Sequence, residues 1–157
     1  MTANDHESVA RAARYAAHIT ALAAAFKVHL NIRTNMRPDE AGAGINLADR
    51  NLPRDQQRLM IMICPVRDET TYAVALHELG HCLHALGSIN NQEGSPTMRL
   101  TRQIATMRDA RLLIDAEAAA WEWAHHYALE WTDAMTAIEV FSRNSYLVTA
   151  RRYGVKV

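Results

Sequence analysis

The spacing of apolar side chains predicts one helix and two strands ahead of the centre of the chain. Residues 7–26 are rich in alanine and carry apolar side chains with the period of a helix. The residues of this apolar stripe are Tyr15, Ile19, Leu22 and Phe26. Residues 28–33 alternate between apolar and polar side chains, which is typical of a half-buried strand. Residues 59–64 form a continuous apolar run that ends at Pro65, so we predict a well-buried strand there.

The remaining segments predict a long loop before the second strand and a helical C-terminal part. Residues 36–58 contain several proline and glycine residues, so we expect an irregular connection that borders a cleft, with a short strand at 45–47. From Met98 to about residue 131 no helix breaker occurs, which predicts one helix or two with a kink. Another helix is expected from Asp133, a suitable N-cap, to about Tyr153. Strands and helices are thus segregated along the chain, which indicates an α+β fold.

Length, charge and cysteine content exclude some classes of function but do not identify one. A length of 157 residues favours one domain over residues 1–157. The formal net charge is zero, so the sequence gives no basic field for nucleic acid or for an anionic membrane surface. Two cysteines, Cys64 and Cys82, are too few for a secreted disulfide framework. The first residues lack the pattern of a signal peptide and no apolar run reaches 18 residues, so we expect a cytoplasmic protein.

The candidate chemistry lies in the segment from Thr70 to Gly87, which contains His77, Glu78 and His81 in the pattern H-E-x-x-H. Two histidines four residues apart lie on the same face of a helix and can hold one metal ion. Glu78 lies about 100° round the helix, too far to ligate easily but close enough to act on a metal-bound water. This arrangement is typical of zinc hydrolases. The alternative is a core helix in which hydrogen bonds satisfy the two histidines.

His84 and Gly87, near the end of this segment, have different expected roles. The longer pattern H-E-x-x-H-x-x-G-x-x-H is not met, because His84 stands where its glycine should be. We therefore expect His84 to support the ligands or to line the cleft. Gly87 is interpreted as the residue that ends the helix, and Asp68 or Thr70 as its N-cap.

A catalytic zinc usually has a third protein ligand, which must come from another part of this chain. The best source is the alanine-rich segment 114–124, because small residues let two helices approach closely. Its candidate ligands, in order of preference, are Glu117, Asp115 and Glu122. The adjacent His125 and His126 are rivals, of which at most one can face a cleft.

The motif followed by this acidic, alanine-rich helix resembles the zincin metallopeptidases. Over residues 28–127 the chain is similar to the ImmA/IrrE-type and related phage or prophage metallopeptidase-like proteins. The resemblance implies a zinc site made by His77, His81 and Glu117, with Glu78 as the general base. It also implies an N-terminal helix with a small sheet, then the active-site helix and a long helical part. The usual E-A-N-x-F-A pattern is replaced here by Glu117-Ala-Ala-Ala-Trp121.

The sequence therefore predicts a zinc-dependent peptidase that hydrolyses a peptide or protein substrate. Its oxyanion donor would be His84, Tyr127 or Tyr146. If the strand at 59–64 is an edge strand, an extended substrate can pair with it. Two alternatives are a zinc-stabilised phage or host regulatory protein without turnover and a metal-free helical interaction module. The sequence does not fix the substrate or the oligomeric state.

Overall fold

The computed structural model describes residues 3–49, 51–53, 56–89 and 107–156. These residues form four α-helices and one three-stranded sheet, so the predicted α+β class is confirmed. In chain order the elements are α1 (Ala3–Ala25), β1 (His29–Ile32), η1 (Pro38–Glu40), β2 (Gly42–Ile45), η2 (Leu47–Asp49), β3 (Leu59–Ile63), α2 (Glu69–Ile89), α4 (Met107–Tyr127) and α5 (Asp133–Arg152). No helix among them is long and apolar enough to cross a membrane.

The sheet has the order β1-β3-β2, with β3 parallel to β1 and antiparallel to β2. The prediction of a buried strand at 59–64 is confirmed, but β3 is the central strand, so the expectation that it could be an edge strand is wrong. The short strand expected at 45–47 lies instead at 42–45, where Gly44 pairs with Met60. In β3 the side chains of Leu59, Ile61 and Ile63 are buried, while those between them are only half-buried.

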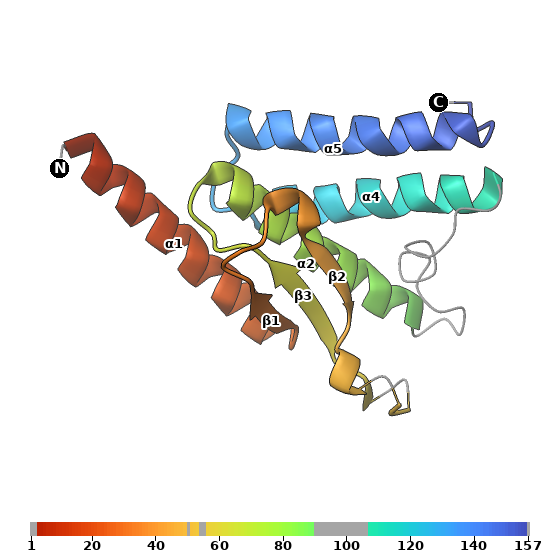
Figure 1. Cartoon of the computed structure of the whole chain (residues 1–157), viewed down its shortest axis with the longest axis horizontal. Helices are drawn as coiled ribbons and strands as arrows, with labels where there is room; N and C mark the ends of the chain where they lie inside the picture. Colours follow the sequence, from red (N-terminus) through yellow and green to blue (C-terminus); the bar gives the residue numbers. More distant parts are fainter. Residues whose placement is uncertain (1–2, 50, 54–55, 90–106, 157) are drawn as a thin grey trace.

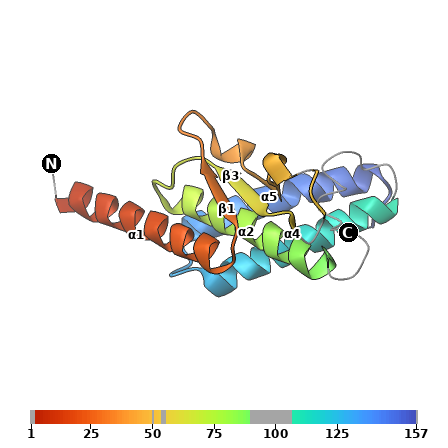
Figure 2. The ribbon, with the colours of Figure 1, turned by 90° about the horizontal axis from the view of Figure 1, so that it is seen from below.

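Helices α1 and α2 cover one face of this sheet, and α2 lies against β3 (Figures 1 and 2). The helix predicted at 7–26 is confirmed and extends further toward the N-terminus. Its Tyr15 and Ile19 are fully buried, and the ring of Tyr15 stacks on Tyr72 of α2 with centroids 4.1 Å apart. The Tyr72 hydroxyl accepts a hydrogen bond from the backbone N–H of Leu129 and also bonds the His18 ring. These contacts fix α2 between α1 and the segment that follows α4.

The first turn of α2 is held by a reciprocal pair of hydrogen bonds. The Asp68 carboxylate accepts from the backbone N–H of Thr71, and the Thr71 hydroxyl accepts from the backbone N–H of Asp68. Asp68 is therefore the N-cap, one of the two residues predicted. The helix continues to Ile89, so Gly87 lies inside it and the expectation that Gly87 ends the helix is wrong.

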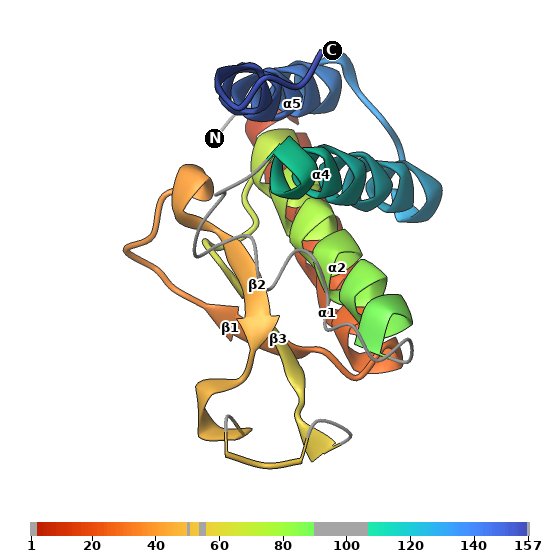
Figure 3. The same ribbon diagram turned by 90° about the vertical axis from the view of Figure 1, so that its right-hand side faces the viewer.

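Helices α4 and α5 run side by side along one side of the molecule, with α5 outermost (Figures 1 and 3). The N-cap of α5 is Thr132, whose hydroxyl accepts from the backbone N–H of Met135. Asp133 was expected in this role and is the first helical residue instead. The predicted helix start at Met98 lies outside the described residues, as does the side chain of His84.

Candidate metal centre

The candidate site lies where α2 and α4 pack closely together. A Cβ atom added at Gly80 would lie 2.5 Å from the backbone oxygen of Ala120, so only glycine fits at this point of α2. On α4 a stripe of small buried residues faces the contact, formed by Ala116, Ala120 and Ala124. The prediction that the alanine-rich helix approaches the motif helix closely is confirmed. The contact brings Glu117, one turn before Ala120, over the two motif histidines.

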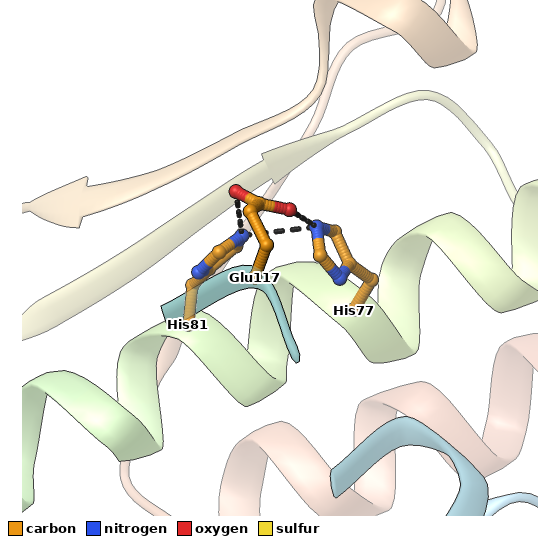
Figure 4. Close-up of side chains that lie close together, drawn as sticks. All are labelled: His77, His81 and Glu117. Carbon is orange, nitrogen blue, oxygen red and sulfur yellow. Dashed lines mark hydrogen bonds and ion pairs between the residues drawn. The ribbon is translucent and has the colours of Figure 1, made fainter. Parts of the chain in front are cut away.

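Figure 4 shows the side chains of His77, His81 and Glu117 pointing toward one another. The Nε2 atoms of the two histidines are 2.9 Å apart. One carboxylate oxygen of Glu117 lies 3.1 Å from His77 Nε2, and the other lies 3.1 Å from His81 Nε2. Three ligand atoms of the types that bind zinc thus converge on one point, with all of them within 4.8 Å of one another.

This cluster is buried in the protein. The exposed fractions are 5% for His77, 6% for His81 and 4% for Glu117. The His77 ring also stacks on the indole of Trp121, with centroids 4.1 Å apart and planes 22° apart. Trp121 is itself fully buried. Trp121 lies one turn after Glu117 on α4. The same helix therefore supplies both the carboxylate and the surface that orients His77.

The pKa values of the three residues depend on burial and on their contacts with one another. Burial alone would raise the pKa of Glu117, but the adjacent imidazoles of His77 and His81 outweigh it and lower that pKa to about 2. Burial lowers the pKa of His77. For His81, burial acts in the same direction, yet the hydrogen bond and charge of Glu117 raise its pKa. Glu117 is therefore an anion at neutral pH, the form in which a carboxylate binds metal.

The residues fit a zinc ion better than they fit one another. The two Nε2 atoms are 2.9 Å apart and each lies 3.1 Å from a different oxygen of Glu117, a spacing at which they can share one ion at the bond lengths of about 2.0–2.2 Å that zinc prefers. Without an ion, the two Nε2 atoms face each other at 2.9 Å, where one must donate and the other accept, and the buried Oε2 of Glu117 has no properly oriented donor among the described residues. Buried polar atoms left in this state are costly. A divalent cation would satisfy all of these atoms at once.

Two further groups border the cluster. Burial raises the pKa of Glu78 to about 7. The charge of His81 lowers this pKa and the charge of Glu117 raises it, both by less than burial does. Tyr146 of α5 lies beside Glu117, and burial together with the charges of Glu117 and Glu78 raises the pKa of its hydroxyl. At neutral pH Tyr146 therefore remains a hydrogen-bond donor. It was one of three candidate donors named from the sequence.

The other candidate ligands lie away from this point. Asp115 and Glu122 are exposed on α4, and the cluster of metal-binding groups found among the described residues contains neither. His126 is also exposed. The His125 ring points to α5 instead, where its Nε2 lies 2.7 Å from Glu139 Oε2. Of the candidates for the third ligand, Glu117 alone joins the two histidines within the part of the chain described here.

Sequence reasoning missed a network beside the site. Glu139 is a buried carboxylate on α5 that accepts hydrogen bonds from His125 and from Arg143. The His125 ring stacks on Trp131, which packs edge to face against Trp121. Stacked and edge contacts therefore connect this network to His77. The spacing of Glu139 and Arg143 indicates a helical ion pair, but nothing in the sequence indicates that its carboxylate is buried.

Comparisons with known proteins add no family to this description: no family model, curated protein or solved structure matches the chain. The resemblance to zincin metallopeptidases rests on the motif and the acidic helix alone.

Proposed function

We propose that the protein is a zinc-dependent metallopeptidase of the cytoplasm that cleaves a peptide or protein substrate. The observation that carries this proposal is the convergence of His77 Nε2, His81 Nε2 and the Glu117 carboxylate within a buried site. These three residues would hold the ion. A bound zinc lowers the pKa of water and polarises a carbonyl group, the two requirements of peptide hydrolysis.

Glu78 is the general base in this proposal. It directly follows one ligand in sequence, and the charges of Glu117 and His81 act on its carboxylate. A base works best when its pKa lies near the operating pH, and burial brings the pKa of Glu78 to about 7. The Glu78 carboxylate accepts a proton from the attacking water and later donates it to the leaving amine.

Tyr146 is the proposed donor to the oxyanion that develops on the substrate carbonyl. Its hydroxyl reaches Glu117 and remains protonated at neutral pH. A donor held in a buried site is worth several kcal/mol of transition-state stabilisation, typically ~3 kcal/mol. Tyr146 would turn its hydroxyl toward the reacting carbonyl.

The sheet offers a place for an extended substrate. Because β3 is central, pairing would use β2, the edge strand that also contacts α2. Edge strands present unpaired backbone groups that can add a further strand. In β2, a Cβ atom added at Gly42 or at Gly44 would meet no atom within 4 Å. A strand without side chains on one face leaves room for those of a substrate.

The decisive variant is Glu78→Gln, with Glu122→Gln as the matched control. Glu122 is an exposed carboxylate on α4, so its loss should change neither zinc content nor cleavage of a peptide library. Glu78→Gln should retain zinc and lose nearly all cleavage, because the amide cannot accept the proton. Tyr146→Phe should lower kcat by about 10²- to 10³-fold with little effect on KM. Full cleavage by Glu78→Gln would rule out this mechanism.

A second function has one observation in its favour. The three proposed ligands are buried, and structural zinc sites are closed to solvent, which favours a zinc-stabilised regulatory protein without turnover as the alternative. In that case wild type would bind zinc and cleave nothing, and Glu78→Gln would behave as wild type in every assay.

A further inference from the structure

Helix α5 has a second face that plays no part in the candidate site. Its inner face carries the buried residues Met135, Glu139 and Ala150, together with Tyr146, which reaches Glu117. Its outer face carries large apolar side chains that are left in solvent. The exposed fraction is 72% for Phe141, and Val140 and Val148 are about half exposed. Figures 1 and 3 show this helix at the outer edge of the molecule.

The outer face has the spacing of a coiled-coil seam. Six exposed residues recur at alternating steps of three and four along α5. They are Ala134, Ala137, Phe141, Asn144, Val148 and Arg151. Steps of three and four place side chains on one stripe, the a and d positions at which two helices pack. The spacing alone is shared by the solvent face of any helix, but four of these six residues are apolar, including Phe141 and Val148.

We propose that α5 is a homodimer interface, on which the α5 helix of a second copy packs in antiparallel orientation. An interface between two identical copies must be self-complementary about a two-fold axis. An axis placed between Phe141 and Asn144 meets this condition for the whole stripe. It pairs Phe141 with Asn144 of the second copy, Ala137 with Val148, and Ala134 with Arg151. All three pairs place a small or polar residue opposite a larger one.

The charges along α5 favour the antiparallel orientation over the parallel one. The helix begins with Asp133 and ends with Arg151 and Arg152. An antiparallel pair brings the acidic start of each helix to the basic end of the other, and the helix dipoles are also opposed. A parallel pair would place like charges together at both ends, which costs free energy. The site residues on the inner face of α5 are left untouched by such a dimer.

Asn144 sets the strength of this interface. A polar residue within the seam fixes the register but lowers the stability of the pair. We therefore expect a dimer that dissociates on dilution. Asn144→Leu should strengthen dimerisation, because an apolar side chain would then meet Phe141 of the second copy.

Sedimentation equilibrium over a concentration series, roughly 1 to 300 µM, tests the interface, since dimerisation follows mass action. Wild type should shift from the 17.6 kDa monomer toward twice that mass as its concentration rises. Phe141→Glu should weaken the dimer at least about tenfold, and Asn144→Leu should tighten it. Val9→Glu is the control, because Val9 is an exposed apolar residue of α1. A wild type that stays monomeric throughout, or a Phe141→Glu variant that dimerises like wild type, would overturn the proposal.

Cross-linking tests the orientation with single cysteines added to the outer face. The native Cys64 and Cys82 are buried, so an introduced cysteine would be the exposed thiol among the described residues. In the antiparallel dimer, Ala137→Cys mixed with Val148→Cys should form disulfide-linked dimers under mild oxidation, and each variant alone should form far fewer. Cross-linking of each variant to itself, with none gained in the mixture, would overturn the antiparallel arrangement. Both experiments are run with and without chelator, so their outcome does not depend on the zinc proposal.

Discussion

The α-carbon of Gly80 lies against the backbone of Ala120 so closely that a side chain at position 80 would begin only 2.5 Å from the Ala120 carbonyl oxygen. This contact sets the separation of α2 and α4 at the level of the candidate metal site. Glu117 lies one helical turn before Ala120, and His81 directly follows Gly80. The distance between the carboxylate and the two histidines therefore depends on a glycine.

Gly80→Ala should destabilise the protein, although glycine to alanine within a helix usually stabilises it by about 0.5–1 kcal/mol. The added methyl group meets backbone rather than a flexible side chain, so we expect the free energy of unfolding to fall by about 1–3 kcal/mol. Zinc affinity should fall with it. Denaturant unfolding measures the first effect, and titration with zinc measures the second.

Gly44→Ala is the control for this change, since a Cβ atom at Gly44 would meet no atom within 4 Å. Its free energy of unfolding should remain near that of wild type. A Gly80→Ala protein more stable than wild type would show that the two helices do not pack as described.

Much of the site was predictable because short-range geometry determines it. The spacing of His77 and His81 places both on one helical face, and the alanine content around Glu117 indicates a close helix contact. The alternatives Asp115 and Glu122 could not be separated from Glu117 by composition. Only the rotation of α4 about its axis decides which carboxylate faces α2, and that rotation is set by the buried stripe opposite Gly80.

The features that the sequence did not predict depend on tertiary contacts. The order of the strands follows from pairing between segments far apart in the chain, so the apolar run at 59–63 predicts a buried strand but does not identify the strands on either side of it. Gly87 has the residue type of a helix end, yet α2 continues past it to Ile89. The buried carboxylate of Glu139 is likewise invisible locally, because its partner His125 comes from another helix.

Glu139→Gln should reduce stability at neutral pH but not in acid. Burial alone would raise the pKa of Glu139, but the hydrogen bonds from His125 and Arg143 lower it below the ordinary value. A lowered folded-state pKa stabilises the protein fully above the ordinary pKa of about 4.3, and this stabilisation is lost as the pH falls through the folded value. We expect a loss of about 1–3 kcal/mol in the free energy of unfolding at pH 7.

Urea unfolding of wild type and Glu139→Gln at pH 7 and at successively lower pH measures this difference. The gap between the two proteins should narrow as the pH falls below about 4. Glu122→Gln, which removes an exposed carboxylate from α4, should track wild type at each pH. A gap that is constant with pH would contradict the account of Glu139 as an ionised partner of His125.

Removal of zinc should lower the melting temperature. An ion that binds only the folded state stabilises it by about 2.7 kcal/mol at a hundred times its dissociation constant. For a chain of this size the loss corresponds to roughly 5–10 °C in Tm. Differential scanning fluorimetry with zinc and with chelator measures the shift, and His77→Ala should show none. An equal Tm for wild type under both conditions would favour the metal-free interaction module.

The most direct test of the metal centre is the zinc content of the protein purified without a metal-affinity tag, measured by elemental analysis. Wild type, His77→Ala, Glu117→Ala and the exposed control Glu122→Ala are compared side by side. The account predicts about one zinc per chain in wild type and in Glu122→Ala, with zinc lost from the other two variants. Zinc that survives Glu117→Ala would contradict the ligand set, and a wild type that takes up no zinc even when it is supplied would contradict the metallopeptidase proposal itself.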